Sequence, residues 1–458
     1  MDERIQTLIS WGQENGVKLH PSVEVYQDEL TGLSFRVKPD AQENVGEYET
    51  IISIPSTITL SFTDAVGEKS PFKNKEQLIA RLEPHVISRL MLMREYLQGK
   101  QSFWWPYIQA LPQPAETDSW LLPPFWPGDE VALLKGTNVE FGIASIAENL
   151  KREFEDLQDA LGEGGDADLA AGATYELYSW AYAIFSSRSF RPSLVLSEEK
   201  QKSLPAGVKV DDFSVLMPLF DIGNHDITRP ARWELEKHDS CTLKIGKVHS
   251  AGEQIFNNYS MKSNAELLLG YGFMIPPRDD LHNDYIHLRK RAPIPGQAFG
   301  DEYFLSRRPM SDPSSIMIRS KLTPTMIQQA DKTLLALQHV QPQMIWDIVT
   351  LVASPEQREA LFPVQGKEGE EADEARLGML LSGAISEENK GLLERVVGTI
   401  QGKLIQELEK LNEHDVEVDE EDLELLTRNQ KLAIDYRQRC RVVLERALEA
   451  MDKDEYFY

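Results

Sequence analysis

The sequence predicts an α+β protein in which short strands and long helices occupy separate stretches of a 458-residue chain. Two observations lead to this prediction. Apolar residues alternate along Thr31–Val37, as they do in a half-buried strand. Between about residues 77 and 190, and again towards the C-terminus, they recur with the period of an amphipathic helix. Because the strand-like segments follow one another with turns between them, a parallel sheet of alternating strands and helices is not expected.

The β-rich part lies near the N-terminus. It is preceded by a helical pattern at Ile5–Gly16, which ends in an Asn-Gly pair typical of a helix C-terminus. Val23–Tyr26, Thr31–Val37 and Glu49–Pro55 then have the composition of strands separated by turn residues. We therefore expect one short helix followed by several short strands.

The middle of the chain is predicted to be helical. An apolar stripe at Leu82–Leu97 keeps a 3.6-residue period, and Pro123–Gly128 interrupts the pattern as a loop. The aromatic-rich segment Tyr175–Phe185 also has helical spacing, and we interpret it as core rather than as a cofactor-binding segment. Beyond Phe273, Thr323 is predicted to cap a helix with Pro324 at its first position.

Composition limits the class of protein. No apolar run approaches the roughly 18 to 20 residues of a membrane span, and the N-terminus has no basic region followed by an apolar one, so we expect a cytoplasmic or nuclear protein without a membrane segment. Two cysteines, Cys241 and Cys440, form neither a disulfide framework nor a zinc cluster. The net charge of −26 disfavours nucleic acid and favours a basic protein partner, although solubility alone explains it equally well.

The segment Met217–Phe273 concentrates the polar residues that could form a site. It opens with Met217-Pro-Leu-Phe-Asp-Ile-Gly-Asn-His225, in which an apolar run meets Asp221, Asn224 and His225. A polar pair directly after an apolar strand is a common place for a functional site, but a turn with a capping Asn and a partly buried His is the plainer interpretation. A strand-like segment then ends at Tyr259.

After Tyr259 the chain predicts a capped helix. Ser263 or Asn264 is expected at its N-cap, and a second tyrosine, Tyr271, follows near its end. The ordered motifs are Asp-x-x-Asn-His, Gly-Glu-Gln-x-x-x-x-Tyr and Lys-Ser-Asn-Ala-Glu-Leu-x-x-x-Tyr-Gly-Phe. In this order they resemble the SET-domain methyltransferases of the Rubisco large-subunit lysine methyltransferase type. That group also contains fungal ribosomal-protein lysine methyltransferases and the actin-histidine methyltransferase.

The resemblance implies a β-rich SET fold with a knot-like active site, split by a helical insert and followed by an all-α C-terminal domain. The implied ranges are 1–76 for the first part of the SET domain, 77–205 for the insert, 206–300 for the second part, and 301–458 for a helical Rubisco-methyltransferase-like substrate-binding domain. The helical part also contains the apolar stripes at Leu392–Leu411 and Leu432–Ala447.

The resemblance also implies roles for individual residues. Tyr259 would be catalytic, S-adenosylmethionine would contact Thr31, Gly32, Leu33, Arg188, Asn224, His225 and Tyr271, and the substrate would contact Asp221, Trp233, Tyr259 and Tyr271. For Arg188, in Ser187-Arg-Ser-Phe190, a structural pairing with an acid is the alternative. No metal is expected, because the histidines lack a paired helical spacing. A Ser-His-Asp hydrolase is disfavoured because the chain has no Gly-x-Ser-x-Gly element at Ser187.

The chemistry of methyl transfer explains why a tyrosine fits. A sulfonium gives its methyl group to an uncharged amine, whereas lysine, with a reference pKa near 10.4, costs roughly 4 to 5 kcal/mol to deprotonate at pH 7. A phenol is neutral at pH 7 and lines a narrow apolar channel, while a carboxylate in the same place would hold the ammonium form. Tyr259 is therefore expected to orient, and to help deprotonate, the amine.

One position departs from the family pattern. Where a further channel tyrosine is usual, the best aligned residue is Trp233, which is bulkier and offers only a donor N–H. It would narrow the channel or change the accepted residue. We expect an S-adenosylmethionine-dependent lysine methyltransferase acting on a basic, ribosomal or translation-related protein. The alternatives are a protein-histidine methyltransferase and a catalytically silent SET-fold adaptor.

Overall fold

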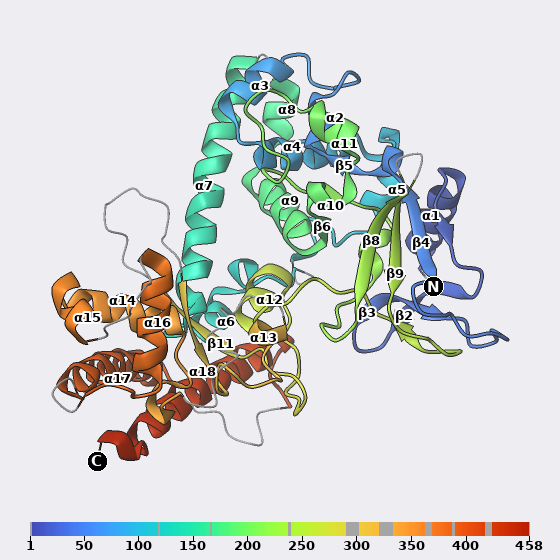
Figure 1. Ribbon diagram of the computed structural model, residues 1–458. Coiled ribbons are helices and arrows are strands. Elements are labelled where there is room, and N and C mark those ends of the chain that lie inside the picture. Colours follow the sequence, from blue (N-terminus) through green and yellow to red (C-terminus); the bar gives the residue numbers. More distant parts are fainter. Residues whose placement is uncertain are drawn as a thin grey trace. The chain divides into compact units, whose positions relative to one another are not determined.

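The computed structural model of the protein describes residues 2–117, 120–164, 167–236, 240–289, 302–319, 333–361, 369–386, 390–416 and 424–457. The chain divides into two compact units (Figure 1). Unit 1 comprises Met1–Trp120 and Ser145–Ser260, and unit 2 comprises Leu121–Ala144 and Met261–Tyr458. The sequence analysis divided the chain into four ranges with other boundaries, and this four-part division stays a prediction. None of the helices in the described ranges is long and apolar enough to cross a membrane.

The strands of unit 1 form three small antiparallel sheets. The first has the order β1 (Lys18–Leu19), β4 (Thr50–Pro55), β9 (Ser240–Ile245) and β8 (Ala231–Glu236); the second β10 (Gln254–Ile255), β3 (Gly32–Val37) and β2 (Val23–Asp28); and the third β5 (Leu60–Ser61), β7 (Val215–Leu216) and β6 (Ser189–Phe190). In every sheet a strand from the first 61 residues pairs with one from beyond residue 188. The early and late segments of unit 1 therefore share common sheets.

The helices of unit 1 are α1 (Glu3–Glu14), α2 (Phe62–Val66), α3 (Lys75–Arg81), α4 (Pro84–Gln98), α5 (Trp105–Ile108), α8 (Ala167–Gly172), α9 (Tyr175–Arg188), α10 (Pro192–Val195) and α11 (Glu198–Lys202). Helix α7 (Val139–Gly164) has residues in both units. Helix α1 begins where Asp2 accepts a hydrogen bond from the backbone of Arg4, and Gly16 follows its end with a φ of 95°. The helices expected at Ile5–Gly16, Leu82–Leu97 and Tyr175–Phe185 are confirmed as α1, α4 and α9.

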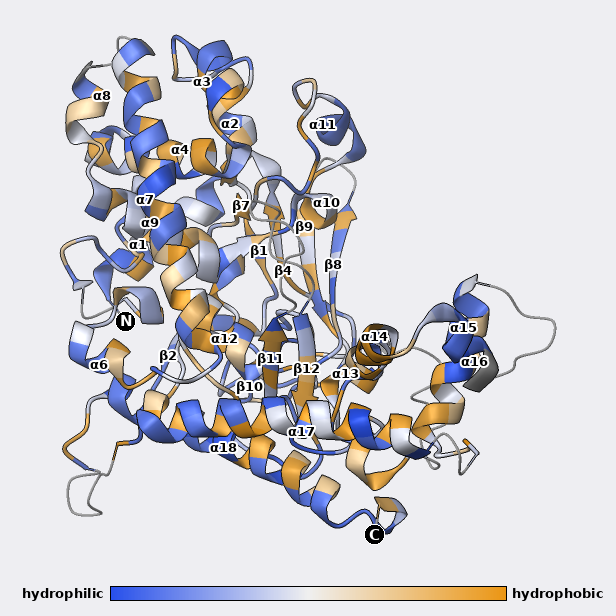
Figure 2. Cartoon of the chain, turned by 90° about the vertical axis from the view of Figure 1, so that its left-hand side faces the viewer, coloured by the Kyte–Doolittle hydropathy of each residue, from blue (hydrophilic) through white to orange (hydrophobic). Residues whose placement is uncertain are grey.

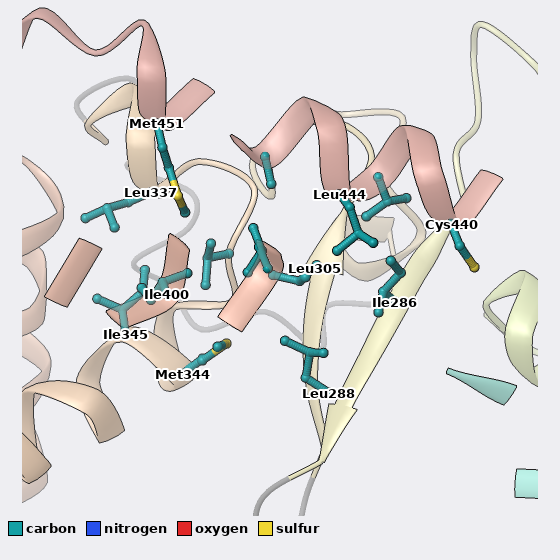
Figure 3. Close-up of a cluster of buried hydrophobic side chains, with 14 of the residues drawn as sticks. Ile286, Leu288, Leu305, Leu337, Met344, Ile345, Ile400, Cys440, Leu444 and Met451 are labelled. Carbon is teal, nitrogen blue, oxygen red and sulfur yellow. The ribbon is translucent and has the colours of Figure 1, made fainter. Parts of the chain in front are cut away.

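Unit 2 packs helices against a β-hairpin. Its elements are α6 (Gly128–Ala132), α12 (Asn264–Tyr271), β11 (Tyr285–Arg289), β12 (Glu302–Ser306), α13 (Ile316–Arg319), α14 (Pro342–Val352), α15 (Pro355–Leu361), α16 (Gly369–Leu381), α17 (Lys390–Glu413) and α18 (Arg428–Asp452). Hydrophilic and hydrophobic residues alternate along α17 and α18 (Figure 2), as expected of helices with one buried face. The labelled side chains in Figure 3 come from β11, β12, α14, α17, α18 and the short 3-10 helix Leu335–Leu337.

Two predictions for this part of the chain can be compared with the structure. The helix expected with Ser263 or Asn264 at its N-cap is present as α12, and its N-cap is Ser263, which forms a capping box with Glu266. The range 301–458 was expected to be all-helical. It also contains strand β12 at its start, which the sequence analysis did not predict. The helix start predicted at Thr323 and Pro324 lies outside the described residues.

Candidate active site

Two segments from distant parts of unit 1, residues 223–226 and 257–259, lie side by side, and we call their pairing the crossing. The backbone N–H of Asn257 donates to the carbonyl of Asn224 at 2.7 Å, and that of Asp226 donates to the carbonyl of Asn257 at 2.9 Å. These two bonds form a parallel bridge between His225 and Asn257. The crossing is held by backbone hydrogen bonds and therefore places the Asn-His motif beside the tyrosine motif.

Tyr259 is fixed by three contacts within the crossing. Its backbone N–H donates to Nδ1 of His225 at 3.0 Å, its ring stacks on the His225 ring with centroids 5.0 Å apart, and its hydroxyl donates to the carbonyl of Gly223 at 2.8 Å. Because Nδ1 accepts a hydrogen bond, a neutral His225 carries its proton on Nε2. Hydrogen bonds thus fix Tyr259 at its backbone N–H and at its hydroxyl.

The side chain of Asn224 attaches strand β3 to the crossing. Its Nδ2 donates to the carbonyls of Thr31 and Leu33, at 3.2 and 3.3 Å. Between them Gly32 has a φ of 78°, a conformation that favours glycine. Gln254 adds a hydrogen bond to the hydroxyl of Thr31 at 2.9 Å. The structure therefore brings the predicted cofactor-binding residues of β3 beside Asn224.

Arg188 and Asp221 form a charged pair next to this region. A guanidinium nitrogen of Arg188 lies 3.5 Å from the carboxylate of Asp221, and the hydroxyl of Tyr107 donates to the same carboxylate at 2.8 Å. The side chain of Asp221 is 2% exposed and that of Arg188 is 31% exposed. The carboxylate is therefore enclosed, while the Arg188 side chain is partly exposed.

Burial and charge shift the pKa values of these groups. Burial lowers the pKa of Arg188, but the Asp221 carboxylate and the hydroxyls of Tyr107 and Tyr259 together raise it by more, so Arg188 stays charged. Burial raises the pKa of Asp221, and Arg188 and Tyr107 oppose that effect. Burial and the Asp221 charge raise the pKa of Tyr107 well above its usual range. Tyr107 therefore stays protonated and donates a hydrogen bond to Asp221.

A cavity of about 260 Å³ opens at this charged pair. It is lined by Asp2, Arg4, Ile5, Leu8, Gln27, Leu33, Tyr107, Ala110, Leu111, Pro112, Glu116, Arg188, Asp221 and Ile222, all of them in unit 1. Three of the predicted site residues, Leu33, Arg188 and Asp221, are thus brought to one hollow of the surface. The wall contributed by helix α1 was not anticipated from the sequence.

The backbone on both sides of the site is strained. Leu219, two residues before Asp221, has a φ of 69°, and Ser260, directly after Tyr259, has a φ of 84°. A residue with a side chain pays roughly 1 to 2 kcal/mol for this left-handed conformation. Leu219 is 1% exposed and packs against Gly12 of α1. This contact leaves no room for a residue larger than glycine at position 12. Strain of this kind is found at functional sites, where surrounding packing maintains it.

Trp233 lies on β8 and contacts the crossing from the side. Its indole N–H donates to Oδ1 of Asn257 at 3.0 Å, and its ring meets Phe190 edge-to-face with centroids 5.1 Å apart. Asn257, Phe190 and Tyr107 were not among the predicted site residues. Phe190 lies in the Ser187-Arg-Ser-Phe190 segment and Asn257 occupies a variable position of the Gly-Glu-Gln-x-x-x-x-Tyr motif, so neither was selected by residue type.

Tyr271 is the one predicted site residue that lies in unit 2. It belongs to α12, where its ring is near Lys262, with Nζ 5.7 Å from the centroid. Burial raises the pKa of Tyr271 to about 12. The structure gives its surroundings in unit 2 only, so its role in the channel stays a prediction. Among the residues that the structure describes, no group of three or more His, Cys, Asp or Glu could hold a metal ion.

Solved structures define the class of fold. The chain matches the SET domain of LSMT bound to methyllysine and AdoHcy with a TM-score of 0.67, at 19% identity, over 99% of this chain and 92% of that one. It matches Rubisco LSMT bound to AdoMet with a TM-score of 0.65, at 20% identity, over the same shares of the two chains. The fold is therefore the α+β SET fold of the Rubisco methyltransferases, as the sequence predicted.

Sequence relatives specify the class further. The ribosomal lysine N-methyltransferase set10 of Schizosaccharomyces pombe is 29% identical over 301 residues, which are 63% of this chain and 51% of that protein. The protein-lysine N-methyltransferase EFM1 of Saccharomyces cerevisiae is 26% identical over 310 residues, 59% of this chain and 49% of that protein. The actin-histidine N-methyltransferase of Gallus gallus is 25% identical over 275 residues, 59% of this chain and 42% of that protein.

The resemblance drawn from the motifs is thus confirmed, because the relatives are protein methyltransferases and the structural neighbours are SET domains. The chain spans about half the length of the curated relatives that it matches. No family model matches the sequence.

Proposed function

We propose that this protein transfers a methyl group from S-adenosylmethionine to the side-chain amine of a lysine in another protein. The observation that carries the proposal is the crossing, in which Tyr259 bonds to His225 while Asn224 holds Thr31 and Leu33 of β3. Three separate motifs of the sequence meet there, beside a cavity. Protein-lysine methyltransferases among the relatives support the same reaction.

The residues around the cavity fit the cofactor. Arg188 carries a permanent charge and lines the cavity, and its guanidinium has five N–H donors, more than the single contact with Asp221 uses. It would bind the cofactor's carboxylate, while β3 at Gly32 and Leu33 would lie against the rest of the molecule. When bound, S-adenosylmethionine supplies a methyl group on a positively charged sulfur. That charge also favours the neutral form of a nearby amine.

Tyr259 is suited to orient the amine. Its hydroxyl donates to the carbonyl of Gly223, and a phenol oxygen that donates in this way is also able to accept a hydrogen bond from an N–H. An amine that donates to this oxygen turns its own lone pair away from Tyr259. Asp221 does not compete for the ammonium form, because its charge is compensated by Arg188 and Tyr107. The site therefore favours an oriented, uncharged nitrogen.

The substrate is proposed to be a basic protein of the translation apparatus, and the reaction to take place in the cytoplasm. A net charge of −26 favours a basic partner, and one relative is named a ribosomal lysine methyltransferase. A histidine acceptor is the second candidate, because an actin-histidine methyltransferase is also among the relatives.

Two measurements test the proposal. Calorimetry should detect binding of S-adenosylmethionine, and its absence would favour a silent SET-fold adaptor. Transfer of labelled methyl groups to a hypomethylated yeast protein extract, followed by acid hydrolysis and chromatography, should give labelled methyllysine. Label in methylhistidine would support the second candidate, and no label in either amino acid would refute methyl transfer to this class of protein.

A further inference from the structure

One oxygen of the Asp221 carboxylate is shared by two side chains from distant parts of unit 1. Oδ2 accepts a hydrogen bond from the hydroxyl of Tyr107 at 2.8 Å, and a guanidinium nitrogen of Arg188 lies 3.5 Å from the same atom. Tyr107 belongs to α5, and Arg188 is the last residue of α9. All three side chains line the cavity. The group that occupies this oxygen therefore affects where the guanidinium lies.

Arg188 and Asp221 do not form the close pair that their side chains allow. Charge-assisted N–H···O bonds are about 2.7 to 2.9 Å long, and an arginine commonly makes two of them to one carboxylate. The guanidinium nitrogen of Arg188 is farther than this from Oδ2, whereas the Tyr107 hydroxyl makes the shorter contact. Arg188 therefore has N–H donors left for a further anionic partner in the cavity.

Tyr107 is held in place because its short helix is anchored at both ends. The indole N–H of Trp104, the N-cap residue of α5, donates to the carbonyl of Ile58 at 3.0 Å. The amide of Gln113 donates to the carbonyl of Ile108, the last residue of α5, at 2.9 Å. Tyr107 itself is 1% exposed. Its hydroxyl is therefore presented to the carboxylate from a fixed position.

Asp221 is also held by its backbone. Its N–H donates to the carbonyl of Met217 at 3.1 Å, and Leu219, between the two residues, has the strained φ of 69° and is buried. Arg188 is different, because its long side chain is 31% exposed. Of the three groups that meet at Oδ2, the guanidinium is thus the one that can move when a contact is lost.

We propose that Tyr107 is a positioning residue that occupies Oδ2 of Asp221 and so keeps the guanidinium of Arg188 available to the carboxylate of the cofactor. The inference rests on the proposed function, in which Arg188 binds that carboxylate. Without the hydroxyl, Arg188 closes on Asp221 as a pair with two hydrogen bonds and has fewer donors for the cofactor. Helix α5 thereby sets the affinity for the amino-acid part of S-adenosylmethionine.

Calorimetry with two ligands tests the inference. S-adenosylmethionine carries the carboxylate, and decarboxylated S-adenosylmethionine differs in lacking it. Tyr107→Phe removes the hydroxyl and keeps the ring, and should raise the Kd for S-adenosylmethionine about fivefold, the effect expected of one hydrogen bond. The Kd for the decarboxylated ligand should change by less than about twofold, because that ligand gives Arg188 no carboxylate to bind.

A double variant tests whether Tyr107 acts through Asp221, and it does not depend on the second ligand. Asp221→Asn removes the charge that draws Arg188 away from the cofactor. Adding Tyr107→Phe to Asp221→Asn should therefore raise the Kd for S-adenosylmethionine no further, since the two changes interrupt the same contact. A residue that served packing alone would instead weaken the binding of both ligands alike, or of neither.

Tyr178→Phe is a matched control, because Tyr178 makes the same kind of contact at residues that do not line the cavity. Its hydroxyl donates to Glu153 at 2.8 Å, and Glu153 pairs with Arg89 at 2.5 Å. This variant should lower the Tm about as much as Tyr107→Phe does and leave both Kd values unchanged.

Three results would overturn the inference while leaving cofactor binding intact. They are an unchanged Kd for S-adenosylmethionine in Tyr107→Phe, equal losses for the two ligands, and a further fivefold loss when Tyr107→Phe is added to Asp221→Asn. Wild-type protein that binds neither ligand would instead refute the proposed function, and the inference with it.

Discussion

Replacing Tyr259 by Phe removes one oxygen and leaves the ring, so its effects can be worked out from three contacts. The ring keeps its stacking on His225, and the backbone N–H keeps its bond to Nδ1. What is lost is the hydroxyl's bond to the carbonyl of Gly223, which contributes about 0.5 to 1.5 kcal/mol to stability. In a unit of this size, 1 kcal/mol corresponds to a decrease in Tm of about 2 to 4 °C. Turnover should fall much more, by about 100-fold or greater, because the amine loses the group that orients it.

Calorimetry and the labelled-methyl assay distinguish these effects. The Kd for S-adenosylmethionine should change by less than about threefold, or roughly 0.7 kcal/mol, since the substitution leaves Arg188 and β3 in place. Tyr436→Phe is a matched control, because it removes a buried hydroxyl that donates to Asn138 at 2.7 Å in unit 2. It should lower the Tm comparably and leave turnover unchanged. Undiminished turnover in Tyr259→Phe, or an equal loss in both variants, would refute the assigned role.

Three further predictions concern the cavity, the strained loop and pH. Arg188→Lys keeps the charge beside Asp221 but loses the planar fork, and should raise the Kd for S-adenosylmethionine about tenfold by calorimetry; an unchanged Kd would place the cofactor elsewhere. Gly12→Ala brings a methyl group into contact with Leu219 and should cost about 1 to 3 kcal/mol in chemical unfolding, which an unaltered midpoint would contradict. Burial lowers the pKa of His282 to about 4, so between pH 6.5 and 4 the unfolded chain binds a proton that the folded one does not. Stability present above pH 6.5 should therefore decline by about 3 kcal/mol towards pH 4, and His282→Gln should flatten that part of the pH profile.

The fold could be predicted where local signals were strong. Helices α1, α4, α9, α17 and α18 follow from apolar periodicity, and the N-cap of α12 was narrowed to Ser263 or Asn264, of which the structure has Ser263. The sheet of β5, β6 and β7 could not be predicted, because these strands have two residues each and β5 pairs with β7 across more than a hundred positions. Such pairing depends on the tertiary structure and leaves no periodic pattern in so few residues.

The sequence predicted those residues of the candidate site that occupy fixed positions in recognisable motifs. The sequence selected Asn224, His225 and Tyr259, and the structure brings them together. It did not select Asn257, because an asparagine before Asn258 in a strand-like segment has no distinguishing local pattern. The contribution of α1 to the cavity was also missed, since a helix with a buried apolar stripe gives no sign of what its first turn faces.

The contacts of the Asn-His pair indicate what that motif does in this protein. The amide nitrogen of Asn224 bonds to Thr31 and Leu33, and Nδ1 of His225 bonds to the backbone of Tyr259. Both side chains therefore satisfy backbone groups of other segments, as buried polar groups generally must. Their first effect is to hold β3 and the phenol in register. It follows that a substitution of Asn224 should weaken cofactor binding by displacing β3, even where no direct contact to the cofactor is lost.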